Sequence, residues 1–194
     1  MYNIIINEVQ LFLNKRKHNL RLSEQYRVTS LFKNTLNEDI NKRNEVLNLI
    51  KNNQWEEQNP QSFYDSLKQS KHPLMLTDYS PIELSKMKLF KLKGYNIGYA
   101  LKQFDNKGYS EIVAVHNNEK DVNNIGHELM QSAINNGGCY LDHFDGFLSN
   151  LYQNMGFIEY NRDMYNPEYD PNSEFKNKYG QSDVIYRVHK NCIK

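Results

Sequence analysis

The chain has 194 residues, with 24 Lys and Arg against 23 Asp and Glu, a formal net charge of +1 at pH 7. This balance argues against a general nucleic-acid-binding protein, which needs an excess of basic side chains to displace counterions. No apolar run approaches the roughly 20 residues of a membrane span, and the N-terminus lacks the residue order of a secretory signal. Cys139 and Cys192 lie far apart and predict neither a disulfide framework nor a zinc site. We therefore expect a soluble protein of the reducing cytoplasm, without a metal or a membrane partner.

Residues 1–71 predict a helical, polar extension without a catalytic motif. An apolar cluster at residues 5–13 is followed by apolar residues at spacings of three and four between positions 28 and 36, as in an amphipathic helix. Apolar residues between positions 40 and 50 predict a further helix. Whether residues 2–6 form a first strand of the main sheet stays open. The extension is expected to pack on the main domain or to bind a partner.

Residues 72–194 are expected to form the main domain, in which short strands alternate with helices. Strands are predicted at residues 89–93, 95–103, 111–116, 139–141, 157–162 and 183–189. Helices are predicted at residues 81–87, 126–135 and 144–153, and a long polar, Tyr-rich loop precedes the last strand. This order requires a mixed, mostly antiparallel sheet flanked by helices, which is an α+β layered fold.

A strand, a polar loop and a helix follow one another in EIVAVHNNEKDVNNIGHELMQSAI, at residues 111–134. The helix begins near Gly126, where backbone N–H groups are unpaired and lie at the positive end of the helix dipole. Such a helix end suits a phosphate or pyrophosphate. Asn124 tolerates positive φ best after glycine, so the loop can curl around an anion. Because this arrangement is common, the segment alone indicates an anion site only weakly.

A second segment, LDHFDGFLSNLYQNMGFIEYNR, places Leu151-Tyr152 near the end of a helix and Gly156-Phe157 at the next strand. Together with residues 96–100 and 126–130, these motifs resemble the GNAT superfamily of N-acetyltransferases in order and spacing. The resemblance covers most of residues 88–162. It implies a divergent member that transfers an acetyl group from acetyl-CoA to an amine of a protein or a small molecule, by direct attack in a ternary complex.

The resemblance also implies roles for individual residues. Tyr152 would be the general acid that protonates the departing CoA thiolate, and Glu111 would be a general base for the acceptor ammonium. Acetyl-CoA would contact the strand and the phosphate loop at Val113, Val115, Asn124, Gly126 and His127. Asp142 and His143 would face the same cleft, where they would bind or deprotonate the amine. From the order of strand, loop, helix and strand, we expect a splay between residues 112–115 and 139–141 that opens this cleft toward Gly126 and exposes a backbone N–H for the oxyanion.

The sequence leaves an alternative to each of these roles. Tyr152 also suits a core position, Glu111 a solvent-facing strand position, and Asp142-His143 a surface loop. Asp121 stands where the family usually has Arg or Gln, and Asn124 stands where it usually has Gly. These two departures support a rival hypothesis, a catalytically inactive GNAT-like module for binding or assembly. A homodimer and an origin in a phage or mobile element are also compatible with the sequence.

Overall fold

The computed structural model describes residues 22–104 and 108–193. The chain divides into two compact units, residues 1–44 and residues 45–194. Helix α2 (Leu22–Lys51) begins in the first unit and ends in the second. The sequence suggested separate helices here, but this segment contains no Gly or Pro, so nothing in its backbone chemistry interrupts the helix. The apolar cluster at residues 5–13 and the strand considered at residues 2–6 lie outside the described residues.

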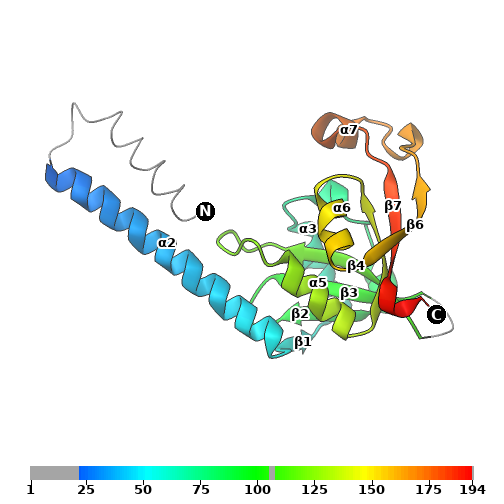
Figure 1. Cartoon of the computed structure of the whole chain (residues 1–194), viewed down its shortest axis with the longest axis horizontal. Coiled ribbons are helices and arrows are strands. Elements are labelled where there is room, and N and C mark those ends of the chain that lie inside the picture. Colours follow the sequence, from blue (N-terminus) through cyan, green and yellow to red (C-terminus); the bar gives the residue numbers. More distant parts are fainter. Residues whose placement is uncertain (1–21, 105–107, 194) are drawn as a thin grey trace. The chain divides into compact units, whose positions relative to one another are not determined.

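The second unit is built on a seven-stranded sheet of order β1-β2-β3-β4-β5-β7-β6 (Figure 1). The strands are β1 (Trp55–Glu57), β2 (Lys88–Leu92), β3 (Ile97–Gln103), β4 (Ser110–Asn117), β5 (Gly138–Phe144), β6 (Phe157–Asp163) and β7 (Val184–His189). Strands β4 and β5 are parallel, and every other neighbouring pair is antiparallel. The predicted α+β architecture, with a mixed and mostly antiparallel sheet, is confirmed.

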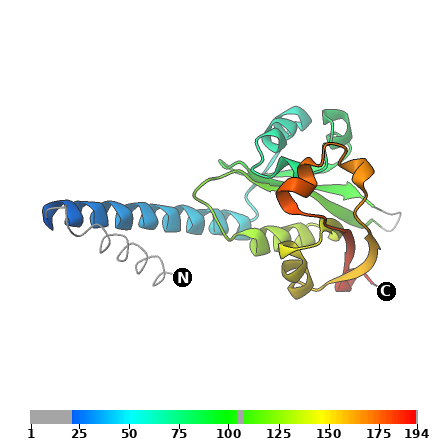
Figure 2. The ribbon, with the colours of Figure 1, turned by 90° about the horizontal axis from the view of Figure 1, so that it is seen from above.

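Helices cover both faces of this sheet (Figure 2). Helices α5 (Gly126–Asn135) and α6 (Phe147–Asn154) lie on one face, and α3 (Pro60–Lys68) and α4 (Pro81–Leu84) lie on the other. Helix α7 (Glu174–Tyr179) lies between β6 and β7 in the chain. Single 3-10 turns form η1 (Pro73–Met75), η2 (Pro167–Tyr169) and η3 (Lys190–Cys192). No described helix is both long enough and apolar enough to cross a membrane.

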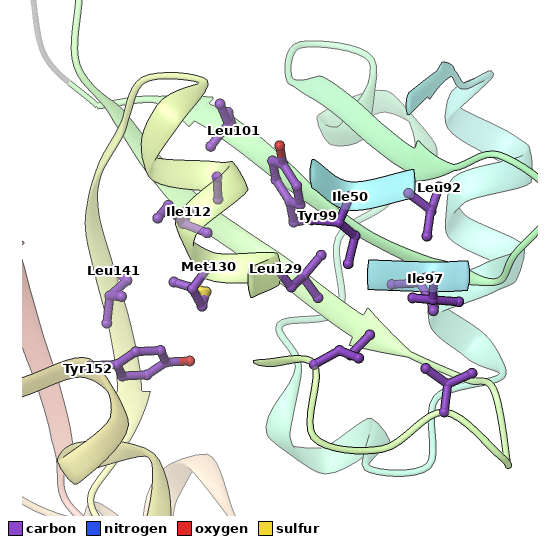
Figure 3. Close-up of a cluster of buried hydrophobic side chains, with 14 of the residues drawn as sticks. Ile50, Leu92, Ile97, Tyr99, Leu101, Ile112, Leu129, Met130, Leu141 and Tyr152 are labelled. Atoms are coloured by element: carbon purple, nitrogen blue, oxygen red, sulfur yellow. The ribbon is translucent and has the colours of Figure 1, made fainter. Parts of the chain in front are cut away.

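The larger hydrophobic core lies between the sheet and α5. Ile112 and Leu141 of the sheet pack with Leu129 and Met130 of α5, and Figure 3 shows these side chains converging. A second cluster on the opposite face joins Phe63 of α3 to β3 and β4. Where helices lie on both sides of the sheet, its strands are therefore buried on both faces, as in other layered folds.

The sheet unit begins earlier than the expected domain start at residue 72. It starts at Glu45 and includes β1, α3 and the end of α2, whose Val46 and Ile50 are buried in the larger core. Strand β1 pairs with β2 from Trp55 to Glu57. A strand of three residues is too short to show alternation in a sequence, which explains why it was not predicted.

Cys139 and Cys192 form a disulfide, although their separation in the sequence did not predict one. The residues are 53 positions apart in sequence, but β5 and β7 are antiparallel neighbours that pair Tyr140 with Val188. This register brings η3, which follows β7, beside the start of β5. Because disulfides persist mainly in oxidising compartments, the cysteines do not support the reducing location that the sequence suggested.

We expect reduction of this disulfide to lower the free energy of unfolding by roughly 2–4 kcal/mol, because the bond closes a long loop in the unfolded chain. Urea denaturation of the wild type with and without a thiol reductant measures the change. The Cys192→Ser variant is the control. Its free energy of unfolding should equal that of the reduced wild type and should not change when the reductant is added. Equal stability of the oxidised and reduced wild type would contradict the expectation.

Candidate functional site

Strands β4 and β5 separate along their length. Their pairing is confined to Ser110 with Gly138 and Glu111 with Tyr140, although β4 continues to Asn117 and β5 continues to Phe144. The predicted splay of these two strands is therefore confirmed. Backbone groups of β4 that face β5 beyond Glu111 are not used by that neighbour.

A bulge in β4 lies within the splayed part. Gly98 pairs with His116 and Ala100 pairs with Val113, so Ala114 and Val115 together oppose the single residue between them on β3. Ala114 has a φ of 54°, in the left-handed region that non-glycine residues seldom adopt. A bulge leaves a residue out of the hydrogen-bond ladder and bends the strand. The backbone amides of β4 are thereby redirected where the strands part.

A cleft of about 600 Å³ lies at this splay. Its walls include five of the residues predicted for the site, Val113, Val115, Asp142, His143 and Tyr152. Leu148 of α6 lines it on one face of the sheet, whereas Leu76 and Tyr79 line it beside the α3 cluster on the other face. The cleft therefore passes from one face of the sheet to the other between β4 and β5.

Four predicted residues lie outside the lining of this cleft: Glu111, Asn124, Gly126 and His127. Asn124 has a φ of 56°, the conformation that was expected for it. A Cβ atom at Gly126 would meet nothing nearer than Leu151 Cδ2, at 3.6 Å, so the start of α5 lies against α6 beside Tyr152. The predicted opening toward Gly126 thus ends short of that residue.

The loop before α5 is held in place by local contacts. The Asn117 side-chain amide donates to the Val122 carbonyl oxygen over 2.7 Å, and Val122 and Ile125 are buried. No described side chain caps α5 at Ile125. Gly126 has neither a positive φ nor a tight packing contact, so the fold itself does not require glycine there. Gly126 and His127, the first residues of α5, are exposed, which leaves room for an anion beside their backbone.

Tyr152 is both a core residue and a cleft residue. Its side chain is 8% exposed and packs beside Leu141, as Figure 3 shows. Burial, with a smaller contribution from the negative charge of Asp142, raises the pKa of the Tyr152 phenol to about 12. Its hydroxyl forms no hydrogen bond to any residue that the structure describes. The phenol therefore stays protonated at neutral pH, and its O–H group can donate a hydrogen bond or a proton to a ligand.

Two carboxylates lie on adjacent strands near the cleft. Asp142 lines the cleft, and partial burial raises the pKa of its carboxyl even though the side chain reaches solvent. Within the described part of the chain, no Lys, Arg or His forms an ion pair with Asp142. Burial also raises the pKa of Glu111, while Lys102, with its Nζ 3.4 Å from Glu111 Oε2, opposes that shift. Of the two carboxylates, Asp142 therefore has the negative charge that nearby cations neutralise less.

His143 is engaged by a residue that sequence reasoning missed. The buried Arg187 on β7 donates from Nε to His143 Nε2 over 2.9 Å. His143 Nδ1 lies 2.8 Å from the Phe144 carbonyl oxygen, which can only accept, so Nδ1 carries the proton. Burial, reinforced by the charge of Arg187, lowers the pKa of His143. Neither ring nitrogen is left for a substrate in this arrangement.

Arg187 and Tyr79 could not be assigned to the site from the sequence. Arg187 reaches His143 only because β7 lies beside β5, an adjacency that the chain order does not reveal. Tyr79 lines the cleft from the segment before α4, which carries no motif. The described residues contain no group of three or more His, Cys, Asp or Glu side chains that could hold a metal ion.

Comparisons with known proteins find similarity only at the level of structure. No protein-family model and no curated protein sequence matches the chain. N-acetylglutamate synthase from Neisseria gonorrhoeae, complexed with coenzyme A and N-acetyl-glutamate, is 14% identical with a TM-score of 0.42, and the match covers 71% of this chain and 34% of that one. A GNAT family acetyltransferase from Elizabethkingia anophelis with acetyl-CoA bound is 24% identical with a TM-score of 0.38, covering 56% and 78%.

A third similar structure is a streptothricin acetyltransferase from Bacillus anthracis in complex with acetyl coenzyme A. It is 15% identical with a TM-score of 0.35, and the match covers 54% of this chain and 62% of that one. Two of these three matches therefore span less than two thirds of the other protein. Because the identities and TM-scores are low, we base the functional proposal on the geometry of the cleft.

The buried histidines predict how stability depends on pH. Burial lowers the pKa of His143 and of His116, so the unfolded chain binds protons that the folded chain does not. Stability from these groups is present above their unfolded pKa of about 6.5 and is lost as pH falls toward their folded pKa values. We expect the free energy of unfolding to fall below pH 6.5, by at most about 1.4 kcal/mol per pH unit for each histidine.

Urea denaturation between pH 5 and pH 8 measures this slope. The His143→Gln variant should show a smaller slope than the wild type, because glutamine can still accept from Arg187 but does not titrate. Glu111 and Asp142 contribute in both proteins and cancel in the comparison. Identical slopes in the two proteins would mean that His143 titrates alike in the folded and unfolded chains.

Proposed function

We propose that the chain is a GNAT-type acetyltransferase, which moves an acetyl group from acetyl-CoA to an amine by direct attack. The observation that carries this proposal is the through-sheet cleft between β4 and β5, with the β4 bulge and Tyr152 in its walls. The sequence motifs support it independently. The similar structures named above contain coenzyme A or acetyl-CoA, which agrees with the same co-substrate here.

Acetyl-CoA would bind with its pyrophosphate at the start of α5. Gly126 and His127 present backbone amides there, and Asn124 holds the preceding loop in its left-handed turn. Because Gly126 is not required by φ or by packing, its lack of a side chain leaves room for a ligand. The pantetheine arm would then follow β4 past Val115 and Val113, whose amides are not used by β5.

The reaction needs two reacting partners to meet within the splay. The amine nitrogen attacks the thioester carbonyl carbon, and a β4 amide redirected by the bulge at Ala114 stabilises the oxyanion. The C–S bond then breaks, and Tyr152 donates its proton to the departing thiolate. Burial makes the phenol a weaker acid than free tyrosine, but the same desolvation makes the thiolate a stronger base. The proton transfer therefore stays close to balanced.

Asp142 is proposed to receive the acceptor amine. It lines the cleft, lacks an ion-pair partner among the described residues, and has a raised pKa that strengthens it as a base. Glu111 lies on the same face of the sheet as Asp142 but outside the lining of the cleft. We therefore assign it an electrostatic effect on the acceptor rather than direct proton abstraction. His143 would position the Tyr152 ring, which it meets edge-on with centroids 4.9 Å apart.

One observation favours the inactive binding module as a second candidate. Asp121 is exposed in the loop that would hold the pyrophosphate, where a carboxylate opposes anion binding. Titration of the chain with acetyl-CoA by calorimetry separates the two functions. Saturable binding and amine-dependent release of CoA support the enzyme, whereas no heat at millimolar acetyl-CoA supports the module.

We expect Gly126→Glu to raise the Kd for acetyl-CoA at least about tenfold, equivalent to about 1.4 kcal/mol. The new side chain places bulk and negative charge where the pyrophosphate approaches the amides of α5. Gln131→Glu is the matched control, because it adds the same charge to an exposed position further along α5. Calorimetry measures both affinities. Unchanged affinity in a folded Gly126→Glu protein would place the anion site elsewhere.

We expect Tyr152→Phe to lower kcat by roughly 10²–10⁴-fold, the range for a positioned general acid, while leaving acetyl-CoA affinity unchanged. The ring and its packing remain, so the free energy of unfolding should change by about 1 kcal/mol or less. Tyr169→Phe is the control, because Tyr169 is 90% exposed on η2 and lies outside the cleft lining.

Steady-state release of CoA and urea denaturation provide the two measurements for Tyr152→Phe. A purely structural role of Tyr152 gives the reverse pattern, with wild-type turnover and a clear loss of stability. That result would remove the phenol from the mechanism.

A further inference from the structure

A cluster of tyrosines lies on the sheet beyond the part that α3 and α4 cover. Those helices pack against β2, β3 and β4. Tyr140 on β5, Tyr160 on β6 and Tyr186 on β7 follow one another, with ring centroids 6.2 Å and 6.3 Å apart. We call these three residues the tyrosine strip. Tyr160 is 50% exposed, so the strip reaches solvent.

The aromatic surface continues on the β3–β4 hairpin. Phe104 stacks on Tyr140 with a centroid separation of 4.0 Å and is itself 44% exposed. Large aromatic rings exposed together, rather than singly, are typical of binding surfaces. The proposed catalytic mechanism uses none of these rings.

The strip and the two carboxylates share one face of the sheet. Asp142 is directly opposite Tyr186, and Glu111 is directly opposite Tyr140, and side chains of opposed residues lie on the same face. Burial raises the pKa of the Tyr160 phenol, and the charges of Glu111 and Asp142 add to the shift. These charges therefore act on the strip as well as on the cleft.

The surroundings of the strip are predominantly negative. Tyr186 donates its hydroxyl proton to Asp163 Oδ2 over 2.8 Å, and Asp142 lacks an ion-pair partner among the described residues. Lys102 is the cation that faces Glu111. Arg162, on the edge strand β6, is already held by Asp145, Glu159 and Asp183. An incoming cation would thus meet rings and carboxylates with little competition from the chain's own cations.

We propose that the tyrosine strip binds a second ammonium group of the acceptor, so that the substrate is an elongated small diamine or polyamine. This inference rests on the proposed function. One amino group would enter the cleft at Asp142, which lines it, while another lies over the rings of Tyr140 and Tyr160. Alkylammonium groups bind the faces of aromatic rings, and adjacent carboxylates strengthen that preference over neutral or anionic ligands.

The spacing of the groups sets the expected length of the substrate. Asp142 and the ring of Tyr186 come from opposed positions on neighbouring strands, and the next ring is 6.3 Å further. A flexible chain of methylene groups lets the two nitrogens of a diamine reach a carboxylate and a ring that lie on neighbouring strands. We therefore choose 1,5-diaminopentane as the probe and pentylamine, which lacks the second amino group, as its matched partner.

Acetylation kinetics with these two amines test the inference. The wild type should have a KM for the diamine roughly tenfold lower than for the monoamine, and Tyr160→Leu should reduce this preference to about twofold without changing kcat. Tyr140→Leu should act in the same direction. Tyr169→Leu is the control, since it removes a tyrosine ring that is 90% exposed and lies outside the strip. Equal KM values for the two amines in the wild type, or a preference that survives both strip variants, would overturn the inference.

Binding without acetyl-CoA separates this inference from the proposed function. Calorimetric titration with 1,5-diaminopentane should show saturable binding that Tyr160→Leu weakens and Tyr169→Leu leaves intact. Such binding in a chain that acetylates no amine would support the strip and reject acetyl transfer. Acetylation of a lysine-containing peptide combined with no binding of the diamine would retain the enzyme and reject the small polyamine as its acceptor.

Discussion

The separation of β4 from β5 is the constraint on which the rest of the molecule depends. These are the parallel neighbours in an otherwise antiparallel sheet, and parallel strands need a crossover connection, which α5 supplies. Their ladder stops after Glu111 and Tyr140, and the bulge at Ala114 turns the free part of β4 further aside. Backbone amides in a buried sheet need partners. A splay that leaves amides unused by the neighbouring strand is therefore well suited to a ligand.

The same separation gives the cleft access to both faces of the sheet. Tyr152 reaches it from the α6 side, whereas Tyr79 reaches it from the side of α3 and α4. Two substrates that approach from opposite faces can meet without competing for the same entrance. The proposed direct transfer in a ternary complex needs such an arrangement, in which Asp142 lines the cleft and lies opposite Tyr186 of the tyrosine strip.

Strand β7 brings the end of the chain to the site. It lies between β5 and β6, so Arg187 meets His143 and the disulfide ties η3 to the start of β5. The buried guanidinium of Arg187 needs hydrogen-bond acceptors. One of them is Nε2 of the neutral His143, whose Nδ1 is hydrogen-bonded to a carbonyl oxygen. The wall of the cleft is stiffened by groups that take no part in the proposed chemistry.

The sequence by itself determined the order and type of most elements in the sheet unit. Periodicity and caps depend on residues two to four positions apart, and these interactions are local. The left-handed conformation of Asn124 and the place of Tyr152 near the end of α6 were predictable for the same reason. The splay was expected from the order of strand, loop, helix and strand between residues 111 and 141.

The tertiary structure alone decided which distant residues meet. The Cys139–Cys192 bond, the Arg187–His143 pair and the tyrosine strip all depend on β7 lying between β5 and β6. Strand order and register are set by the packing of whole elements, and a register shift of one residue turns every side chain to the other face. Contacts of this kind leave no periodic signal in the sequence, because their partners are separated by complete helices and strands.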